Sequence, residues 1–134
     1  MTETIYALDA SAVLCAFFDE PGADVVAARM NGALLSAVSY HEIVAKLVDR
    51  QLPPHDIRLI MSQLDVEVVP VDRRQAEIAG LLRAHTRDAG LSLGDRACLA
   101  LAFDRKATAL TADKAWAGLE LELELEDIAV ELVR

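Results

Sequence analysis

The chain has 134 residues and a formal charge of −9, from 22 acidic and 13 basic residues. Hydrophobic residues make up 54 % of it, which is enough for a packed core and excludes a disordered or collagen-like chain. Its long apolar stretches without a charge, such as 10–18 and 33–40, are shorter than the roughly 20 apolar residues of a membrane-spanning helix. The first four residues carry an acid and no base, which is unlike a secretion signal. We therefore expect a single cytoplasmic domain over 1–134 that makes no contact with a membrane.

Short apolar runs alternate with helical spacing along most of the chain, and Gly, Pro and capping residues mark the boundaries. The first half predicts a strand over 5–8, helices over 11–18 and 23–30, a strand over 33–38, and a helix from Ser39 that ends before Pro53. The pattern then predicts a helix over 54–64, a strand over 66–71, helices over 73–88 and 93–105, and a strand over 107–110. Strands separated by helices are typical of a parallel sheet covered on both faces, so the predicted fold class is α/β.

Three predicted helix starts carry capping residues. Ser39 and Glu42 match the capping box S-x-x-E, and Asp72 and Ser92 each directly precede a predicted helix. A side-chain oxygen at such a position accepts a hydrogen bond from an unpaired backbone N–H of the first turn. Capping is therefore a sufficient structural explanation for each of these residues.

The last part of the chain alternates Leu and Glu over 119–126 and continues with apolar residues at Ile128, Val130 and Leu132. A period of two predicts a strand with one face in the core and the other in water. Six acids and no base lie between 120 and 131. A solvated strand face explains this charge better than a docking surface.

Several common site types are absent from the sequence. It has no G-x-x-x-x-G-K-[ST] or G-x-G-x-x-G motif, which argues against P-loop and dinucleotide sites. His41-Glu42 begins like a zinc-protease motif, but Ala45 stands where the second histidine belongs. Cys15 and Cys98 have neither zinc-ligand spacing nor the pattern of a disulfide framework, so we expect both to be buried apolar residues.

Four carboxylates remain at predicted element boundaries. Asp9 and Asp113 follow strands, and Glu42 and Asp95 lie in the first turns of helices. Each of them alone is explained by helix capping or a turn. In an open parallel sheet, however, the carboxyl ends of the strands and the amino ends of the following helices face one crevice. The four carboxylates are therefore expected to converge there.

Converging carboxylates repel one another and raise each other's pKa unless a cation lies between them. Mg²⁺ and Mn²⁺ prefer oxygen ligands and keep water in the remaining positions, which leaves room for a substrate phosphate. The pattern thus favours metal-assisted hydrolysis of a phosphate ester, and such an ion would also let an acidic chain act on nucleic acid. The hydroxyls of Ser11 and Thr111, each two residues from one of the acids, are candidates to support the site, although capping and turn formation explain them equally well.

Three stretches of the chain resemble the PIN-domain ribonucleases, and within them the VapC-like toxins of type II toxin–antitoxin modules. They are Leu8-Asp9-Ala10-Ser11-Ala12 with Glu20-Pro21-Gly22-Ala23, then Leu93-Gly94-Asp95-Arg96-Ala97-Cys98-Leu99-Ala100-Leu101-Ala102, and finally Leu110-Thr111-Ala112-Asp113-Lys114-Ala115-Trp116. The resemblance implies a three-layer α/β/α sandwich with a mainly parallel sheet, a Mg²⁺- or Mn²⁺-dependent endoribonuclease activity, and inhibition by a cognate antitoxin. The family's metal-binding acids correspond to Asp9, Glu42, Asp95 and Asp113, and its supporting hydroxyls to Ser11 and Thr111.

The resemblance also implies contacts with RNA and with protein partners. Candidate RNA contacts are Arg73, Arg74, Arg96 and Lys114, although ordinary solvated charge is the better explanation for any one of them. An antitoxin would lay an apolar segment into a groove between the helices before and after Glu42 and bring a basic side chain toward the acids. For a homodimer, the interface candidates are Leu14, Phe17 and Phe18, which suit a core role better.

Two other function classes fit the sequence less well. A non-catalytic RNA- or protein-binding module on the same fold would be expected to lack at least one of the four acids, and none is missing. A signalling receiver domain has a similar size, but it would carry paired acids after the first strand, and Asp9 is followed by Ala10. The sequence therefore favours the metal-dependent endoribonuclease.

Overall fold

The computed structural model describes residues 3–119, 122–123 and 126–134. At its centre lies a five-stranded sheet in the order β3-β2-β1-β4-β7, in which every neighbouring pair is parallel. Its strands are β1 (Tyr6–Leu8), β2 (Ala33–Ser36), β3 (Val66–Val69), β4 (Thr108–Thr111) and β7 (Val130–Leu132). The helices are α1 (Ala10–Phe17), α2 (Ala23–Met30), α3 (Ala37–Asp49), α4 (Pro54–Ser62), α5 (Arg73–Leu81), α6 (Arg83–Thr86) and α7 (Leu93–Arg105), with a 3-10 turn η1 (Lys114–Trp116).

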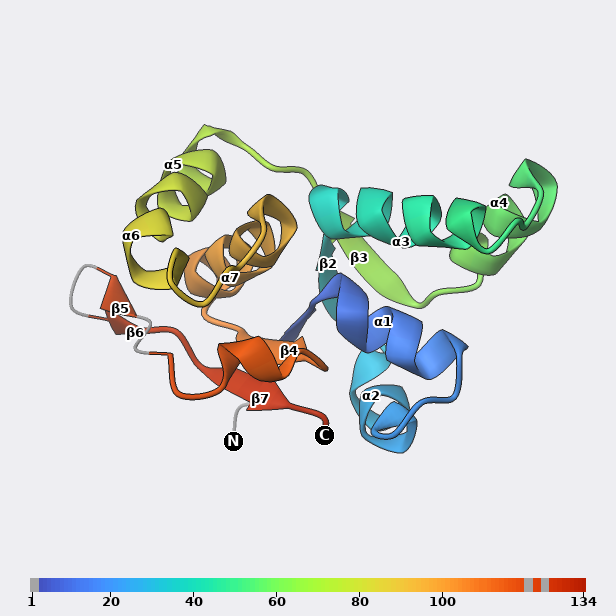
Figure 1. The fold of residues 1–134 in the computed structure, drawn as a ribbon, viewed down its shortest axis with the longest axis horizontal. Helices are drawn as coiled ribbons and strands as arrows, with labels where there is room; N and C mark the ends of the chain where they lie inside the picture. Colours follow the sequence, from blue (N-terminus) through green and yellow to red (C-terminus); the bar gives the residue numbers. More distant parts are fainter. Residues whose placement is uncertain (1–2, 120–121, 124–125) are drawn as a thin grey trace.

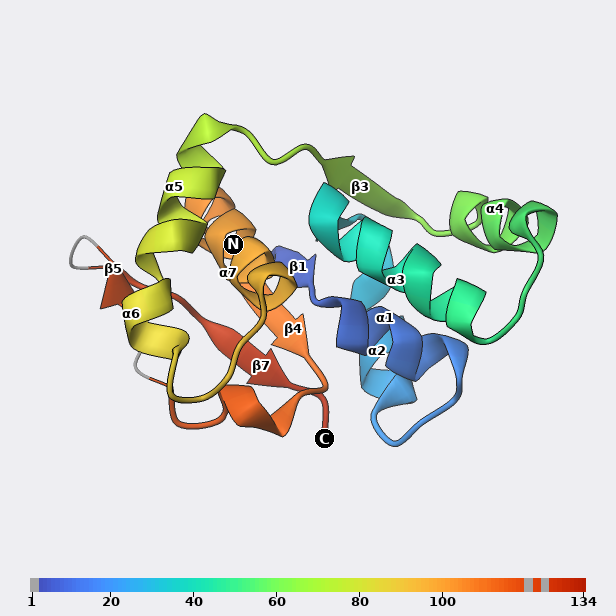
Figure 2. The same cartoon turned by 45° about the horizontal axis from the view of Figure 1, so that its top comes forward.

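Helices cover both faces of the sheet, which makes a three-layer α/β/α sandwich (Figure 1, Figure 2). Side chains alternate along each strand, so neighbouring residues enter different cores. Ala7 and Leu34 belong to the core under α5 and α7, whereas Leu8 and Leu35 belong to the core under α1, α2, α3 and α4. The predicted fold class is therefore confirmed. In the described part of the chain, no helix has the length and hydrophobicity to cross a membrane.

Strands β1 and β4 lie side by side in the middle of the sheet, with Leu8 opposite Leu110. Asp9 continues this pairing by one position, because its N–H donates to the Leu110 carbonyl at 2.9 Å. The carboxyl ends of the two strands therefore bring together chain segments that are far apart in sequence, and each of these segments carries one of the candidate acids.

Helix α3 starts one turn earlier than predicted. Its N-cap is Ser36, whose Oγ accepts a hydrogen bond from Val38 N at 3.2 Å. Strand β2 ends at Ser36 because its pairing with β3 ends there, opposite Val69. The predicted capping box of Ser39 and Glu42 is therefore wrong. Ser39 lies inside the helix, and its buried Oγ has no hydrogen-bond partner among the described residues.

The helix predicted over 73–88 is divided into α5 and α6. Asp72 caps α5 as predicted, since its Oδ1 accepts from Gln75 N at 2.8 Å. At the division, the Leu82 carbonyl accepts from His85 N and from the Thr86 hydroxyl, each at 3.0 Å. A Thr hydroxyl that bonds to the carbonyl four residues back competes with the helical hydrogen-bond pattern, which explains the break.

The last segment is not the single strand that the Leu/Glu alternation predicted. It contains an antiparallel pair, β5 (Glu122–Leu123) and β6 (Glu126–Asp127), followed by β7. The alternation's positions 120, 121, 124 and 125 lie outside the described residues. β7 pairs with β4 only as far as β4 extends, so a strand of the predicted length would run past the sheet. Before β7, the described residues Glu122–Leu123 pair with Glu126–Asp127 instead.

Candidate active site

Asp9 is the most deeply buried of the four candidate acids. It follows β1 and is 3 % exposed. Ser11 Oγ donates to its Oδ2 at 2.6 Å, and Thr111 Oγ1 donates to the same oxygen at 3.0 Å. Within the described residues, Oδ1 receives no hydrogen bond, so this oxygen is available to a ligand. Burial raises the pKa of Asp9 to about 6; the two hydroxyl bonds oppose the rise, and the charges of Asp95 and Glu42 add to it.

The two hydroxyls tie the ends of β1 and β4 together. Ser11 Oγ and Thr111 Oγ1 lie 3.1 Å apart. Each also accepts a backbone N–H at 3.0 Å, Ser11 from Ala112 and Thr111 from Asp113. A hydroxyl has a single proton, so donation to Asp9 combined with acceptance from the backbone fixes its orientation. The structure thus places both predicted hydroxyls directly on the buried carboxylate.

Glu42 and Asp95 lie where α3 meets the amino end of α7. Burial raises the pKa of Glu42, and the charge of Asp95 raises it further. Burial also raises the pKa of Asp95; its bonds with Ser92 oppose the rise, and the charge of Asp113 adds to it. The charge of Asp95 is thus close enough to interact with each of the other three carboxylates.

Asp95 and Asp113 also act as the helix caps that the sequence predicted. Asp95 Oδ2 accepts from Ser92 N at 2.8 Å, and Ser92 Oγ accepts from Asp95 N at 3.2 Å, which forms a reciprocal capping box. Asp113 Oδ1 accepts from Ala115 N at 2.9 Å and caps η1. Each cap occupies one carboxylate oxygen, so capping and ligand binding do not exclude each other. Glu42 lies beyond the cap of α3, and capping therefore no longer explains it.

The four carboxylates are near one another but do not surround a single point. Among the described residues, no three His, Cys, Asp or Glu side chains are close enough to hold a metal ion as they stand. In the same part of the chain, none of the four forms an ion pair with a basic residue. Their oxygens are nonetheless the donors that Mg²⁺ and Mn²⁺ prefer, so the residues fit such an ion once side chains rotate to close around it.

Two of the candidate RNA contacts are next to the acids in the sequence. Arg96 and Lys114 directly follow Asp95 and Asp113 in the chain. Burial raises the pKa of Asp95, and the charge of Arg96 opposes that rise. Arg96 also connects α7 to α5, because its Nη1 donates to the Ala79 carbonyl at 3.4 Å.

The other two candidates, Arg73 and Arg74, begin α5. Arg74 Nε lies 2.7 Å from Oδ1 of Asp104, in the last turn of α7. Asp95 is at the opposite end of that helix, and at 1.5 Å per residue the distance along its axis is about 14 Å. The structure therefore does not bring these two arginines to the acids.

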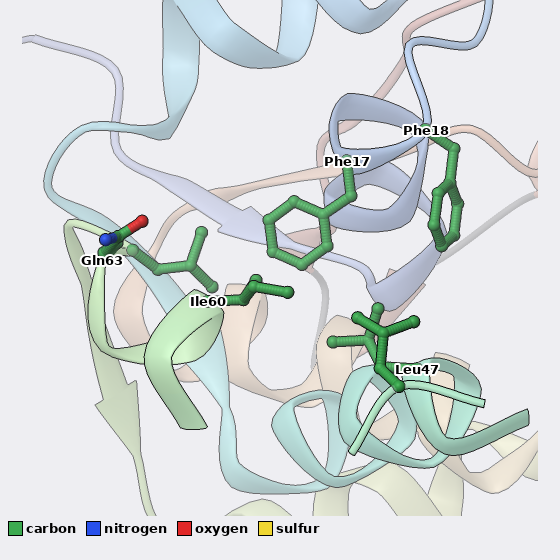
Figure 3. A pocket seen from close by; sticks show the side chains of 7 residues that line it. Phe17, Phe18, Leu47, Ile60 and Gln63 are labelled. Atoms are coloured by element: carbon green, nitrogen blue, oxygen red, sulfur yellow. The ribbon is translucent and has the colours of Figure 1, made fainter. Parts of the chain in front are cut away.

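An apolar pocket lies between α1, α3 and α4. Phe17 and Phe18 reach it from the end of α1, Leu47 from α3 and Ile60 from α4 (Figure 3), and its volume is about 480 Å³. The Arg50 guanidinium lies 4.0 Å from the centre of the Phe18 ring, a cation–π contact. Both phenylalanines are half-buried, so the core role expected for them is only partly right.

Comparison with protein-family models matches residues 6–120 to the PIN domain. Among solved structures, the chain is similar to a DNA-bound VapBC from Salmonella typhimurium, with 14 % identity, a TM-score of 0.72, and coverage of 98 % of this chain and 100 % of that one. It is also similar to a toxin–antitoxin complex from Klebsiella pneumoniae, with 17 % identity, a TM-score of 0.68, and coverage of 93 % and 100 %. A third similar structure is FitAcB from Neisseria gonorrhoeae, with 19 % identity, a TM-score of 0.67, and coverage of 96 % of this chain and 98 % of that one. Identities this low show a shared fold, and a sequence search of curated proteins finds no match.

Proposed function

Because the chain belongs to the PIN domain family, we propose that it is a Mg²⁺- or Mn²⁺-dependent endoribonuclease, the toxin of a type II toxin–antitoxin pair acting on cytoplasmic RNA. The observation that carries the proposal is the set of four carboxylates at one edge of the sheet, with Asp9 buried and its Oδ2 held by two hydroxyls. A buried carboxylate without a basic partner lowers stability unless a cation compensates for its charge. Helix capping explains Asp95 and Asp113, but it explains neither the burial of Asp9 nor the position of Glu42.

Asp9, Glu42, Asp95 and Asp113 would hold the ion through carboxylate oxygens, Asp9 through its Oδ1. A bound divalent ion supplies Lewis-acid chemistry, which makes water a better nucleophile and stabilises negative charge on phosphate oxygens. Ser11 and Thr111 orient Asp9 so that Oδ1 faces the ligand. Burial raises the pKa of Asp9, and the bonds from these hydroxyls favour its ionised form.

Positive side chains would hold the RNA beside these acids. Arg96 and Lys114 are the nearer candidates, and their charges would neutralise phosphates on either side of the cleaved bond. Arg73 and Arg74, at the far end of α7, would contact a more distant part of the RNA chain.

Cleavage of a mixed RNA pool tests the proposal. The protein is incubated with Mn²⁺ or Mg²⁺, beside an EDTA control and the variant Asp95→Asn. This variant keeps an oxygen for the Ser92 cap but loses the charge, so it should fold and lose cleavage. The control variant Asp56→Asn changes an exposed acid on α4, outside the four carboxylates, and should cleave as the wild type does.

Two outcomes would contradict the nuclease. Cleavage that persists in EDTA or in Asp95→Asn would show that the carboxylates do not perform it. Absence of cleavage by folded protein, free of any partner, would favour the alternative of a non-catalytic RNA- or protein-binding module on the same fold.

The apolar pocket supports the partner in this proposal. A solved neighbour of the fold is a toxin–antitoxin complex. We propose that an apolar helix or extended segment of a cognate antitoxin binds between α1, α3 and α4 and brings a basic side chain toward the acids. The half-buried rings of Phe17 and Phe18 offer the aromatic surface that commonly anchors such a segment.

Co-expression with the product of the reading frame directly upstream tests this partner. Ile60→Ser makes the pocket polar and should weaken the complex at least tenfold, by analogy with other interface anchors. Leu59→Ser changes the neighbouring residue, which is 53 % exposed and outside the pocket, and should leave the complex unchanged. Equal binding by the two variants would contradict the pocket as the docking site. The solution mass of the toxin alone tests the expected homodimer.

A further inference from the structure

Gly94 is the second residue of α7 and directly precedes Asp95. It is buried, and a Cβ added to its backbone would overlap Oε1 of Glu42. Glu42 comes from α3, which belongs to the other helical layer and meets α7 at this edge of the sheet (Figure 1). The Glu42 carboxylate therefore occupies the space that a side chain at position 94 would take.

The backbone does not require a glycine at this position. Four of the six glycines have positive φ, which other residues rarely adopt, whereas Gly80 and Gly94 lie in helices without one. Glycine is also less favourable than alanine within a helix. Gly80 has open space around it, with no atom within 4 Å of an added Cβ. The distinguishing feature of Gly94 is thus the carboxylate that lies against it.

We propose that Gly94 is a positioning residue of the active site: because it lacks a side chain, the Glu42 carboxylate can lie beside Asp95, against the first turn of α7. This inference rests on the proposed function, since both carboxylates belong to the proposed metal site. The positive end of the helix dipole favours a carboxylate at the amino end of α7, which partly offsets the repulsion from Asp95. Any side chain at position 94 displaces Glu42 from this place.

The substitution Gly94→Ala should alter the site without unfolding the protein. The atoms that a new methyl group would meet are the end of the flexible Glu42 side chain, which can turn away. Alanine is favoured over glycine in a helix, so the melting temperature of the metal-free variant should stay the same or rise. Gly80→Ala has the same effect on a helix without touching the site, and it is the matched control.

Mn²⁺ affinity, measured by titration calorimetry, and RNA cleavage test the proposal. Gly94→Ala should weaken both by about 10- to 100-fold, the range found when an outer partner of a metal ligand is removed. Gly80→Ala should change neither. Glu42→Asp should also weaken both, because its shorter chain does not reach the same place. In the double variant Gly94→Ala/Glu42→Asp, the new methyl group has already displaced the carboxylate at position 42, so shortening that side chain adds no further loss.

A metal-free experiment separates this inference from the proposed function. Gly94→Ala should raise the melting temperature more in a Glu42→Ala background than in the wild type, because only the wild type has the carboxylate in the way. Equal effects in the two backgrounds, or wild-type Mn²⁺ affinity in Gly94→Ala, would overturn the role of Gly94. If the backgrounds differ but the wild type neither binds Mn²⁺ nor cleaves RNA, the proposed function fails while Gly94 still positions Glu42.

Discussion

Replacing Asp9 with asparagine should stabilise the metal-free protein at neutral pH. Asp9 is 3 % exposed, and burial raises its pKa from 3.8 to about 6. Above pH 6 the native protein therefore buries a charge that the unfolded chain exposes to water. Asparagine keeps an oxygen that can accept from Ser11 and Thr111 but carries no charge.

The two pKa values give the magnitude of this effect. One pKa unit corresponds to about 1.4 kcal/mol, so the difference between 3.8 and about 6 amounts to roughly 3 kcal/mol. The native state binds the Asp9 proton more tightly than the unfolded state does. The free energy of unfolding of the wild type therefore falls by this amount as the pH rises from about 4 to about 6. Asp9→Asn has no such titration. Its free energy of unfolding should equal that of the wild type near pH 4. At pH 7 it should be higher by roughly 3 kcal/mol, which corresponds to about 10 °C in melting temperature.

Urea and thermal unfolding in EDTA, from pH 4 to 7.5, measure the difference. Asp88→Asn is the control, because Asp88 is exposed and its replacement should change the free energy of unfolding by less than about 0.5 kcal/mol. If Asp9→Asn is less stable than the wild type at pH 7, or if their difference does not change with pH, the reasoning from a buried charge is refuted.

Three further predictions concern metal, hydrogen bonding and capping. Mn²⁺ at 100 times its dissociation constant should raise the free energy of unfolding of the wild type by about 2.7 kcal/mol in thermal melts and leave Asp9→Asn unchanged; an equal rise in both would place the ion elsewhere. Thr111→Val removes a hydrogen bond that opposes the effect of burial, so an NMR titration should find the pKa of Asp9 above its wild-type value of about 6, and a lower value would contradict the assigned bond. Ser36→Ala removes the N-cap of α3 and should lower stability by about 1 kcal/mol, whereas Ser39→Ala removes a hydroxyl without a partner among the described residues and should be neutral or stabilising. The reverse order in urea unfolding would identify Ser39 as the cap after all.

Helix starts were predictable where contacts close in the sequence determine them. Helix α7 has the predicted bounds, 93–105, because Ser92 and Asp95 lie three residues apart and bond to each other. Ser39 and Glu42 have the same spacing but do not start a helix. There the pairing of β2 with β3 ends the strand at Ser36, and the helix begins directly after it. Spacing within one segment cannot reveal where a distant strand pairing stops.

The site was predictable to the level of the sheet edge. Asp9 and Asp113 both follow strands, and the structure makes those strands neighbours at the centre of the sheet. The contact between Glu42 and Gly94 depends on how α3 meets α7, and the apolar pocket depends on how α1, α3 and α4 pack. Neither arrangement is specified by residue spacing. The role of the four acids in binding a metal stays a prediction.

The proposed nuclease requires the four carboxylates to bind a divalent ion, and a Mn²⁺ titration of five proteins tests this most directly. These are the wild type and the neutral variants Asp9→Asn, Glu42→Gln, Asp95→Asn and Asp113→Asn. We expect the wild type to bind Mn²⁺ and each substitution to weaken that binding at least tenfold, in line with the loss of a charged ligand. Equal affinity in all five proteins, or no binding by the folded wild type, would contradict the account.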